Sequence, residues 1–151
     1  MKIGGQPISR PIDEIIVLPR GDQNIIFKAQ AVINYEEFEK LCPEPQPPTR
    51  NYPGGRQEIA NDDPNFLKNR DDWANKRSSW LIIESLKVTP GLEWETVDYS
   101  KPETWENYRK ELEGTFTTGE INAIIGGVFK ANSLDEDRFE QARKQFLATQ
   151  Q

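Results

Sequence analysis

The fold of this chain is decided by its longest periodic segment, residues 62–87, which reads DDPNFLKNRDDWANKRSSWLIIESLK. Asp62 and Asp63 stand directly before Pro64, and an acidic cap followed by proline is a typical helix start. Aromatic residues then recur every seven positions, and an apolar residue follows each of them: Phe66, Trp73 and Trp80, then Leu67, Ala74 and Leu81. This spacing predicts an apolar stripe along a central core helix over residues 64–87.

The sequence after this segment predicts three more helices. The first spans residues 101–114, with a proline near its start and a glycine at its end. Thr117 with Glu120 and Ser133 with Glu136 each match a capping box, which predicts two further helix starts. The expected core of the helical region is Phe66, Trp73, Trp80, Leu81, Trp105, Tyr108, Leu112, Ile121, Ile124, Ile125, Phe139 and Phe146.

A glycine pair, Gly126 and Gly127, lies inside the helix that is predicted to start at Thr117. Each glycine disfavours a helix by about 1 kcal/mol relative to alanine. Either the helix kinks there or another element approaches its backbone closely. We expect close packing.

The N-terminal part of the chain predicts a β-hairpin and one short helix. Residues 14–18 and 24–29 are rich in β-branched residues, and the turn between them contains proline and glycine. The tripeptide Arg-Gly-Asp at 20–22 also occurs in integrin ligands, but here we interpret it as turn chemistry. Asn34 is the expected cap of a helix over residues 35–41.

Two segments show no periodic apolar pattern. Residues 1–13 are predicted to form an extended arm. Residues 43–62 contain many prolines and glycines, which predicts a loop with polyproline character. A loop of this length is either a linker or flexible flap, or a dedicated recognition loop.

Together these patterns predict an α+β protein with four parts. An extended N-terminal arm covers residues 1–13, and a β-hairpin with a short helix covers 14–42. A Pro/Gly-rich loop follows over 43–62. Residues 63–151 are predicted to form a bundle of about four helices.

The composition excludes most catalytic chemistry. The 151 residues include no histidine and one cysteine, so Ser-His-Asp and Cys-His nucleophiles and histidine metal sites are absent. Three acidic clusters, at 62–63, 71–72 and 135–137, do not match the oxygen spacing of an EF-hand loop. We interpret them as helix caps or solvated side chains. The sequence therefore predicts a protein that is not an enzyme, with no metal site and no cofactor.

The charge distribution favours a protein partner. The net charge is -6, and residues 89–151 carry twelve acidic and seven basic residues. Nucleic acid binding needs a basic stripe, which is missing here. No signal peptide is visible and the apolar runs are too short to span a membrane, so we expect a cytoplasmic protein without a membrane partner.

Four residues are the candidate partner-binding site. Trp94 lies between Glu93 and Glu95 in a predicted connection, where an aromatic ring is less readily explained as core. Aromatic residues are the anchors that protein interfaces favour. Tyr52, in the Pro/Gly-rich loop, is the fourth candidate.

Several segments together resemble those of small proteins encoded in the tail-morphogenesis region of tailed bacteriophages and prophages. The matching segments are residues 14–20, 37–45, 94–98, 102–108, 131–136 and 142–147. These proteins look like tail assembly chaperones. The resemblance carries no catalytic motif.

The resemblance implies an acidic, mainly helical protein that works in the cytoplasm of the bacterial host. Such a chaperone binds the tape-measure protein, keeps its apolar helices from aggregating and helps to recruit tail-tube subunits. The hairpin and the Pro/Gly-rich loop exceed what a minimal helical chaperone needs, which leaves two other functions open. The chain could be a structural component of the tail or head-tail junction and remain in the virion, or a phage-encoded regulator that binds a host protein.

Overall fold

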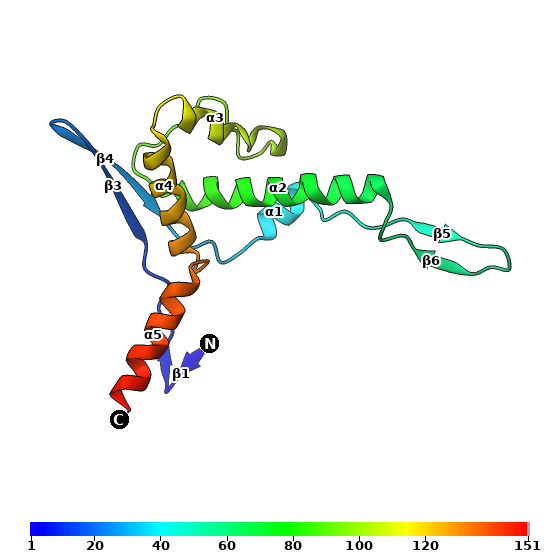
Figure 1. Cartoon of the computed structure of the whole chain (residues 1–151), viewed down its shortest axis with the longest axis horizontal. Coiled ribbons are helices and arrows are strands. Elements are labelled where there is room, and N and C mark those ends of the chain that lie inside the picture. Colours follow the sequence, from blue (N-terminus) through cyan, green and yellow to red (C-terminus); the bar gives the residue numbers. More distant parts are fainter. Residues whose placement is uncertain (151) are drawn as a thin grey trace. The chain divides into compact units, whose positions relative to one another are not determined.

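The computed structural model describes residues 1–150 and has an α+β fold with a helical C-terminal region, which confirms the predicted fold class (Figure 1). The strands are β1 (Lys2–Ile3), β2 (Gln6–Pro7), β3 (Glu14–Arg20), β4 (Gln23–Ala29), β5 (Thr49–Asn51) and β6 (Gln57–Ile59). The helices are α1 (Glu36–Leu41), α2 (Pro64–Leu86), the 3-10 helix η1 (Pro102–Thr104), α3 (Asn107–Glu113), α4 (Thr118–Ala131) and α5 (Glu136–Thr149). Within residues 1–150 the strands pair in chain order into three antiparallel hairpins.

The chain divides into two compact units, and each unit is assembled from separate segments. The hairpin unit contains Met1–Ile33, Glu84–Glu93 and the chain from Glu113 onward. The aromatic unit contains Asn34–Ile83 and Trp94–Leu112. These divisions do not coincide with the predicted boundaries after residues 13, 42 and 62, because contacts between distant segments define the units.

The hairpin unit is built around β3 and β4, and the predicted hairpin is confirmed. A two-residue turn, Gly21 and Asp22, joins the strands, and Gly21 has a positive φ of 57° that glycine adopts without strain. The inner face of this hairpin packs on α4. The buried apolar residues of this unit are Ile16, Leu18, Phe27, Ala29, Ala31, Leu86, Ile124, Val128 and Ala131.

Helix α4 has the capping box and the close packing at a glycine that the sequence predicts for it. Thr117 caps the helix by accepting from the backbone N–H of Glu120, and the Glu120 side chain accepts from the Thr117 N–H in return. A Cβ at Gly127 would lie 2.5 Å from two side-chain carbons of Ile16 on β3. Glycine at this position therefore allows the close packing that we expected, while Gly126 has no such neighbour in the described chain.

The aromatic unit has a core of stacked rings. Phe38 of α1 is fully buried, and its ring centroid lies 5.7, 5.6 and 5.9 Å from those of Trp73, Trp80 and Trp105. The ring planes are tilted by 40–50°, a geometry that aromatic pairs favour. This cluster joins α1 and α2 to the segment that precedes α3.

The predicted central helix is confirmed as α2, but its apolar stripe is buried only towards its C-terminal end. Trp80 and Leu81 are buried, Trp73 is half-buried and Ala74 is exposed. The predicted helix over 101–114 is split into η1 and α3.

The largest correction concerns α5, which was expected to contribute to the core. Phe139 and Phe146 are 59% and 61% exposed, and no residue of Glu136–Thr149 is buried. The predicted capping box at Ser133 is also wrong: the helix begins at Glu136, and Asp135 caps it by accepting from the backbone N–H of Asp137. Ser133 has a φ of 58°, so the chain turns there before the helix starts.

Three further local predictions are corrected. The arm predicted over residues 1–13 contains the small hairpin of β1 and β2, and the loop predicted over 43–62 contains that of β5 and β6. Glycines with positive φ occupy both turns, which explains how segments without apolar periodicity form hairpins. At α1 the N-cap is Tyr35, while the Asn34 side chain accepts from the backbone N–H of Glu36.

Candidate protein-binding site

The β3–β4 hairpin has apolar side chains on both faces. Alternation along β3 sends Ile16 and Leu18 inward, where they are buried, and Ile15 and Val17 to the opposite face. Ile15 and Val17 are 64% and 51% exposed, and Ile26 of β4 is 53% exposed. Continuous apolar runs of this kind are typical of strands that are covered on both faces.

The three exposed residues form one patch because of the strand register. Val17 lies directly opposite Ile26, and Ile15 is the next outward residue along β3. Directly paired side chains on one face of a hairpin lie about 5 Å apart. We call Ile15, Val17 and Ile26 the outer face of the hairpin. Contiguous exposed apolar residues mark surfaces that bind other molecules.

One ion pair ties the turn end of this hairpin to α4, and a second lies within the hairpin at its open end. Near the turn, Arg20 bonds to Glu120 of α4 with an N···O distance of 2.7 Å, and its guanidinium lies 5.5 Å from the Phe116 ring centroid. Near the other end, Lys28 lies 3.6 Å from Asp13. The hairpin is thus fixed to α4 through its inner face and its end, which leaves the outer face exposed.

Glu120 both caps α4 and pairs with Arg20, and both interactions affect its ionisation. The backbone N–H of Thr117 and the side chain of Arg20 both donate to its carboxylate, and the first of these has the larger effect. They lower the pKa of Glu120 below its usual value, although desolvation opposes the shift. Glu120 therefore stays ionised while it caps α4 and holds Arg20.

Three of the residues predicted to bind a partner are consecutive. Glu93 and Glu95 are exposed, whereas Trp94 is half-buried. The indole N–H of Trp94 donates to the Tyr99 hydroxyl at 3.2 Å, and that hydroxyl donates to the backbone carbonyl of Ile83 at 3.3 Å. The polar edge of Trp94 is thus engaged within the aromatic unit, and part of its ring is accessible.

Glu95 is held through its backbone. Its N–H donates to one carboxylate oxygen of Glu111 at 2.8 Å, and Thr96 donates to the other from both its N–H and its hydroxyl. Partial burial of Glu111 opposes ionisation, but these hydrogen bonds outweigh it and lower the pKa of Glu111. The segment that carries Trp94 is therefore joined to α3 by hydrogen bonds.

Tyr52, the fourth predicted residue, lies on a different element. It occupies the turn of the β5–β6 hairpin, where its N–H donates to the Arg56 carbonyl and the Arg56 guanidinium lies 4.7 Å from its ring centroid. In Figure 1 this hairpin extends beyond the N-terminal end of α2. The structure therefore places Tyr52 on a projecting turn and Trp94 in a connection that follows α2.

The residues of the outer face were not among the candidates from the sequence. The signal was present in the apolar runs of residues 14–18 and 24–29, because a hairpin that needed cover on one face would alternate apolar and polar residues. Ordinary core packing also explains such runs. Only the position of α4 shows which face is covered within the chain.

The described residues form no metal site and no membrane-spanning helix, and the chain has no detectable relatives. Among residues 1–150 no three histidine, cysteine, aspartate or glutamate side chains come together as a metal site would require. No helix in this part of the chain has the length and apolarity to cross a membrane. The chain matches no protein-family model, and no curated protein and no solved structure is detectably similar to it.

Proposed function

We propose that this protein is not an enzyme and acts by holding an amphipathic helix of another protein against the outer face of the β3–β4 hairpin. The exposure of Ile15, Val17 and Ile26 on one side of a hairpin that is already packed on α4 is the observation that supports this. An apolar sheet face is stabilised when a helix covers it. A partner helix on the outer face would complete a layer arrangement of helix, hairpin and helix.

We further propose that the partner is the tape-measure protein of a bacteriophage tail and that the chain acts as a tail assembly chaperone in the bacterial cytoplasm. The resemblance of the sequence segments supports this assignment. The net charge of -6 suits it, since an acidic protein attracts basic segments of a partner. A long helical partner with apolar stripes would otherwise aggregate, and transient cover of those stripes is the work of a chaperone.

Co-expression with a phage tape-measure protein tests the proposal. We expect the chain to keep that protein soluble and to co-purify with it. The double variant Val17→Thr/Ile26→Thr removes apolar surface and keeps β-branched side chains, so the hairpin should persist while co-purification is lost. Ile59→Thr is the matched control, because Ile59 is an exposed strand isoleucine of the other unit. Equal co-purification by both variants would contradict the role of the outer face.

A second candidate function is a structural component of the tail or head-tail junction. The observation in its favour is the N-terminal arm, in which Ile3, Ile8 and Ile12 are all exposed. Extended arms with apolar residues become ordered when they lie over neighbouring subunits. Purified particles distinguish the two functions, because a chaperone is absent from them and a structural component is present in many copies.

A further inference from the structure

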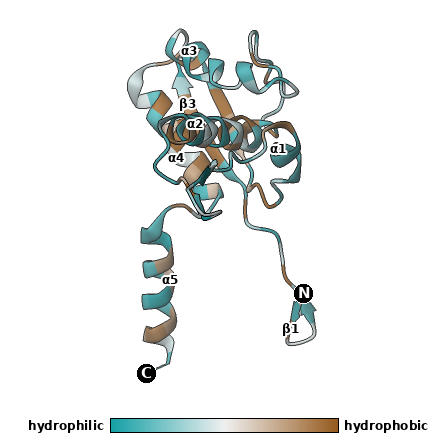
Figure 2. Cartoon of the chain, turned by 90° about the vertical axis from the view of Figure 1, so that its right-hand side faces the viewer, coloured by the Kyte–Doolittle hydropathy of each residue, from teal (hydrophilic) through white to brown (hydrophobic). Residues whose placement is uncertain are grey.

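Helix α5 carries an apolar face that nothing in residues 1–150 buries. Phe139, Ala142, Phe146 and Leu147 fall at i, i+3, i+7 and i+8, a spacing that places them on one side of the helix. Figure 2 shows hydrophobic bands on α5 between hydrophilic ones. This face is separate from the outer face of the hairpin, so the inference below does not depend on the proposed function.

The length of α5 makes an unpaired state marginal. It has 14 residues, and isolated helices shorter than about 12–15 residues are only marginally stable in water. Its first turn is fixed by Arg138, which donates to the carbonyl of Lys130 and pairs with Glu14 of β3. The remainder of the helix has an exposed apolar face, and cover for that face would stabilise it.

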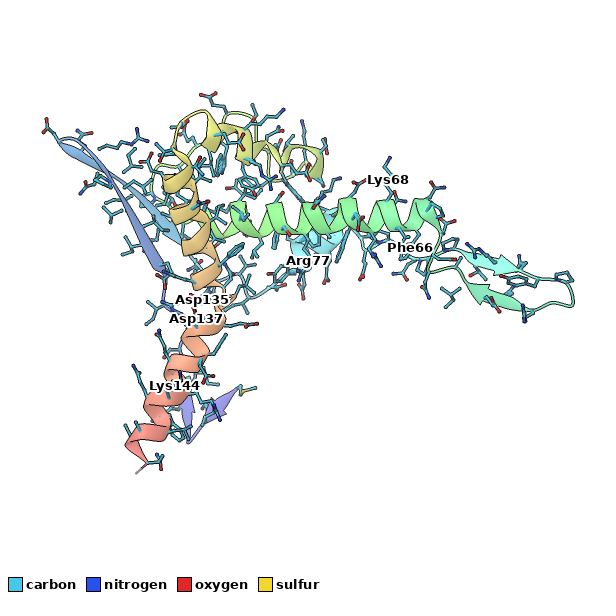
Figure 3. All side chains as sticks on the ribbon, viewed as in Figure 1. Phe66, Lys68, Arg77, Asp135, Asp137 and Lys144 are labelled. Atoms are coloured by element: carbon cyan, nitrogen blue, oxygen red, sulfur yellow. The ribbon has the colours of Figure 1, made fainter. Side chains whose placement is uncertain are left out.

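The charges of α5 are divided between its two halves. The residues from Glu136 to Ala142 include three acidic and one basic side chain, a net charge of -2, and those from Arg143 to Thr149 include two basic side chains and no acidic one, a net charge of +2. In Figure 3 Asp135 and Asp137 lie at the start of the helix and Lys144 lies towards its end. The helix is thus complementary to a second copy of itself that runs in the opposite direction.

We propose that α5 is a homodimerisation helix that pairs antiparallel with α5 of a second copy of this chain. A two-fold axis near Ala142 and Arg143 places Phe139 opposite Phe146 of the second copy, and each acidic half lies beside a basic half. A two-fold interface needs a surface that complements itself, and the charge division in α5 supplies one. A parallel pair would instead align like charges.

Among residues 1–150, the charged side chains in the second half of α5 form no strong ion pair within one copy. Arg143 lies 3.7 Å from Glu140 in the same helix, and both side chains are more than half exposed. Exposed pairs of this kind contribute little to stability, so Arg143 can exchange partners at low cost. The charges that would face the second copy are therefore accessible.

The size of the interface sets the expected strength. Each helix is about 21 Å long, so a pair of them buries less than the roughly 1,200 Å² that marks the low end of specific interfaces. We therefore expect a dimer in the micromolar range that weakens as salt screens the exposed charges.

Sedimentation equilibrium on the full chain at low salt, from about 1 to about 200 µM, measures this association. Two charge variants make the test specific. Arg143→Glu/Lys144→Glu gives both halves of the helix a net charge of -2, and Glu136→Lys/Glu140→Lys gives both halves a net charge of +2. Each alone should dimerise at least about tenfold more weakly than the natural chain, and an equimolar mixture should recover the association. Recovery in the mixture also shows that both variants are folded.

Engineered disulfides report the direction of pairing. In a Cys42→Ser background, Glu136→Cys on one copy should crosslink to Gln150→Cys on another, because an antiparallel pair brings opposite ends of α5 together. Preferential crosslinking of Gln150→Cys to itself would indicate a parallel pair and overturn the proposal. If the protein is a monomer at every concentration, the dimer proposal is also overturned. The apolar face of α5 would then be covered by a hairpin of the same chain or by a different protein.

Discussion

Helices α4 and α5 are equally long and follow one another in the chain, but only α4 is packed into the core. Each has 14 residues, an N-terminal side-chain cap and a periodic apolar face. Helix α4 buries Ile124, Gly127, Val128 and Ala131 in the hairpin unit, whereas α5 buries none of its residues. An amphipathic pattern therefore predicts a helix and its apolar face, but it does not say whether the same chain covers that face.

The charge content of the two helices explains part of the difference. Two of the residues of α4 are charged, whereas six of those of α5 are. Burial of charges without partners costs free energy, so α5 can bury only a narrow face. The glycine at position 127 of α4 also allows Ile16 to approach the backbone, and α5 has no glycine.

Truncation of one apolar side chain in each helix should show the largest contrast. Ile124 is fully buried, so Ile124→Ala should lower the free energy of unfolding by about 2–5 kcal/mol, as expected when a cavity forms. Phe146 is exposed, so Phe146→Ala should change it by less than about 0.5 kcal/mol in dilute protein. Urea titrations of both variants measure the difference. Equal losses would mean that α5 is packed against its own chain.

The adjacent glycines of α4 provide a second contrast of opposite sign. A methyl group at Gly127 would overlap with Ile16, so Gly127→Ala should destabilise the protein by about 1–3 kcal/mol. A methyl group at Gly126 has no neighbour in the described chain within 4 Å, so Gly126→Ala should stabilise it by up to about 1 kcal/mol through helix propensity. Melting temperatures of the two variants give the signs. A stabilising Gly127→Ala would show that Ile16 moves away easily.

Loss of the N-terminal cap should lower the global stability for α4 but only the local helix content for α5. Thr117→Ala should lower the global free energy of unfolding by about 1 kcal/mol, because α4 is part of the core. Asp135→Ala removes the cap of α5 and should reduce the helical circular dichroism signal while leaving the urea midpoint nearly unchanged. A shift of that midpoint as large as the one for Thr117→Ala would mean that α5 unfolds together with the core.

The smallest expected effect is the pH dependence of the ion pair that fixes the hairpin to α4. The pKa of Glu120 in the folded protein is below its ordinary value of 4.5. Its stabilisation is therefore present above pH 4.5 and is lost as the pH falls through the lower folded pKa. Thermal melts of the natural chain and of Glu120→Gln should differ at neutral pH and converge in acid. A difference that persists at low pH would assign the effect to something other than ionisation.

The exposure of residues in the candidate site could be predicted from the sequence only in part. The position of Trp94 between two glutamates predicts an accessible ring, and the structure shows its N–H bonded to Tyr99 with the ring half-buried. Val17 and Ile26 lie in the apolar runs of the predicted hairpin, and both are exposed. Sequence patterns record which residues are apolar, but exposure depends on what packs beside them.

Elements with local causes could be predicted from the sequence alone. Apolar periodicity, an acidic cap and a proline account for α2, a capping box accounts for the start of α4, and a glycine turn between β-branched runs accounts for the β3–β4 hairpin. Each of these causes acts over a few residues, within one turn or one strand pair.

Which apolar faces are covered depends on the tertiary structure. Phe139 and Phe146 have the same spacing and chemistry as core residues, yet they are exposed, whereas Phe38 of a six-residue helix lies at the centre of the aromatic unit. The physical reason is that burial requires a complementary surface from a distant part of the chain, and the pattern of one segment contains no information about that surface.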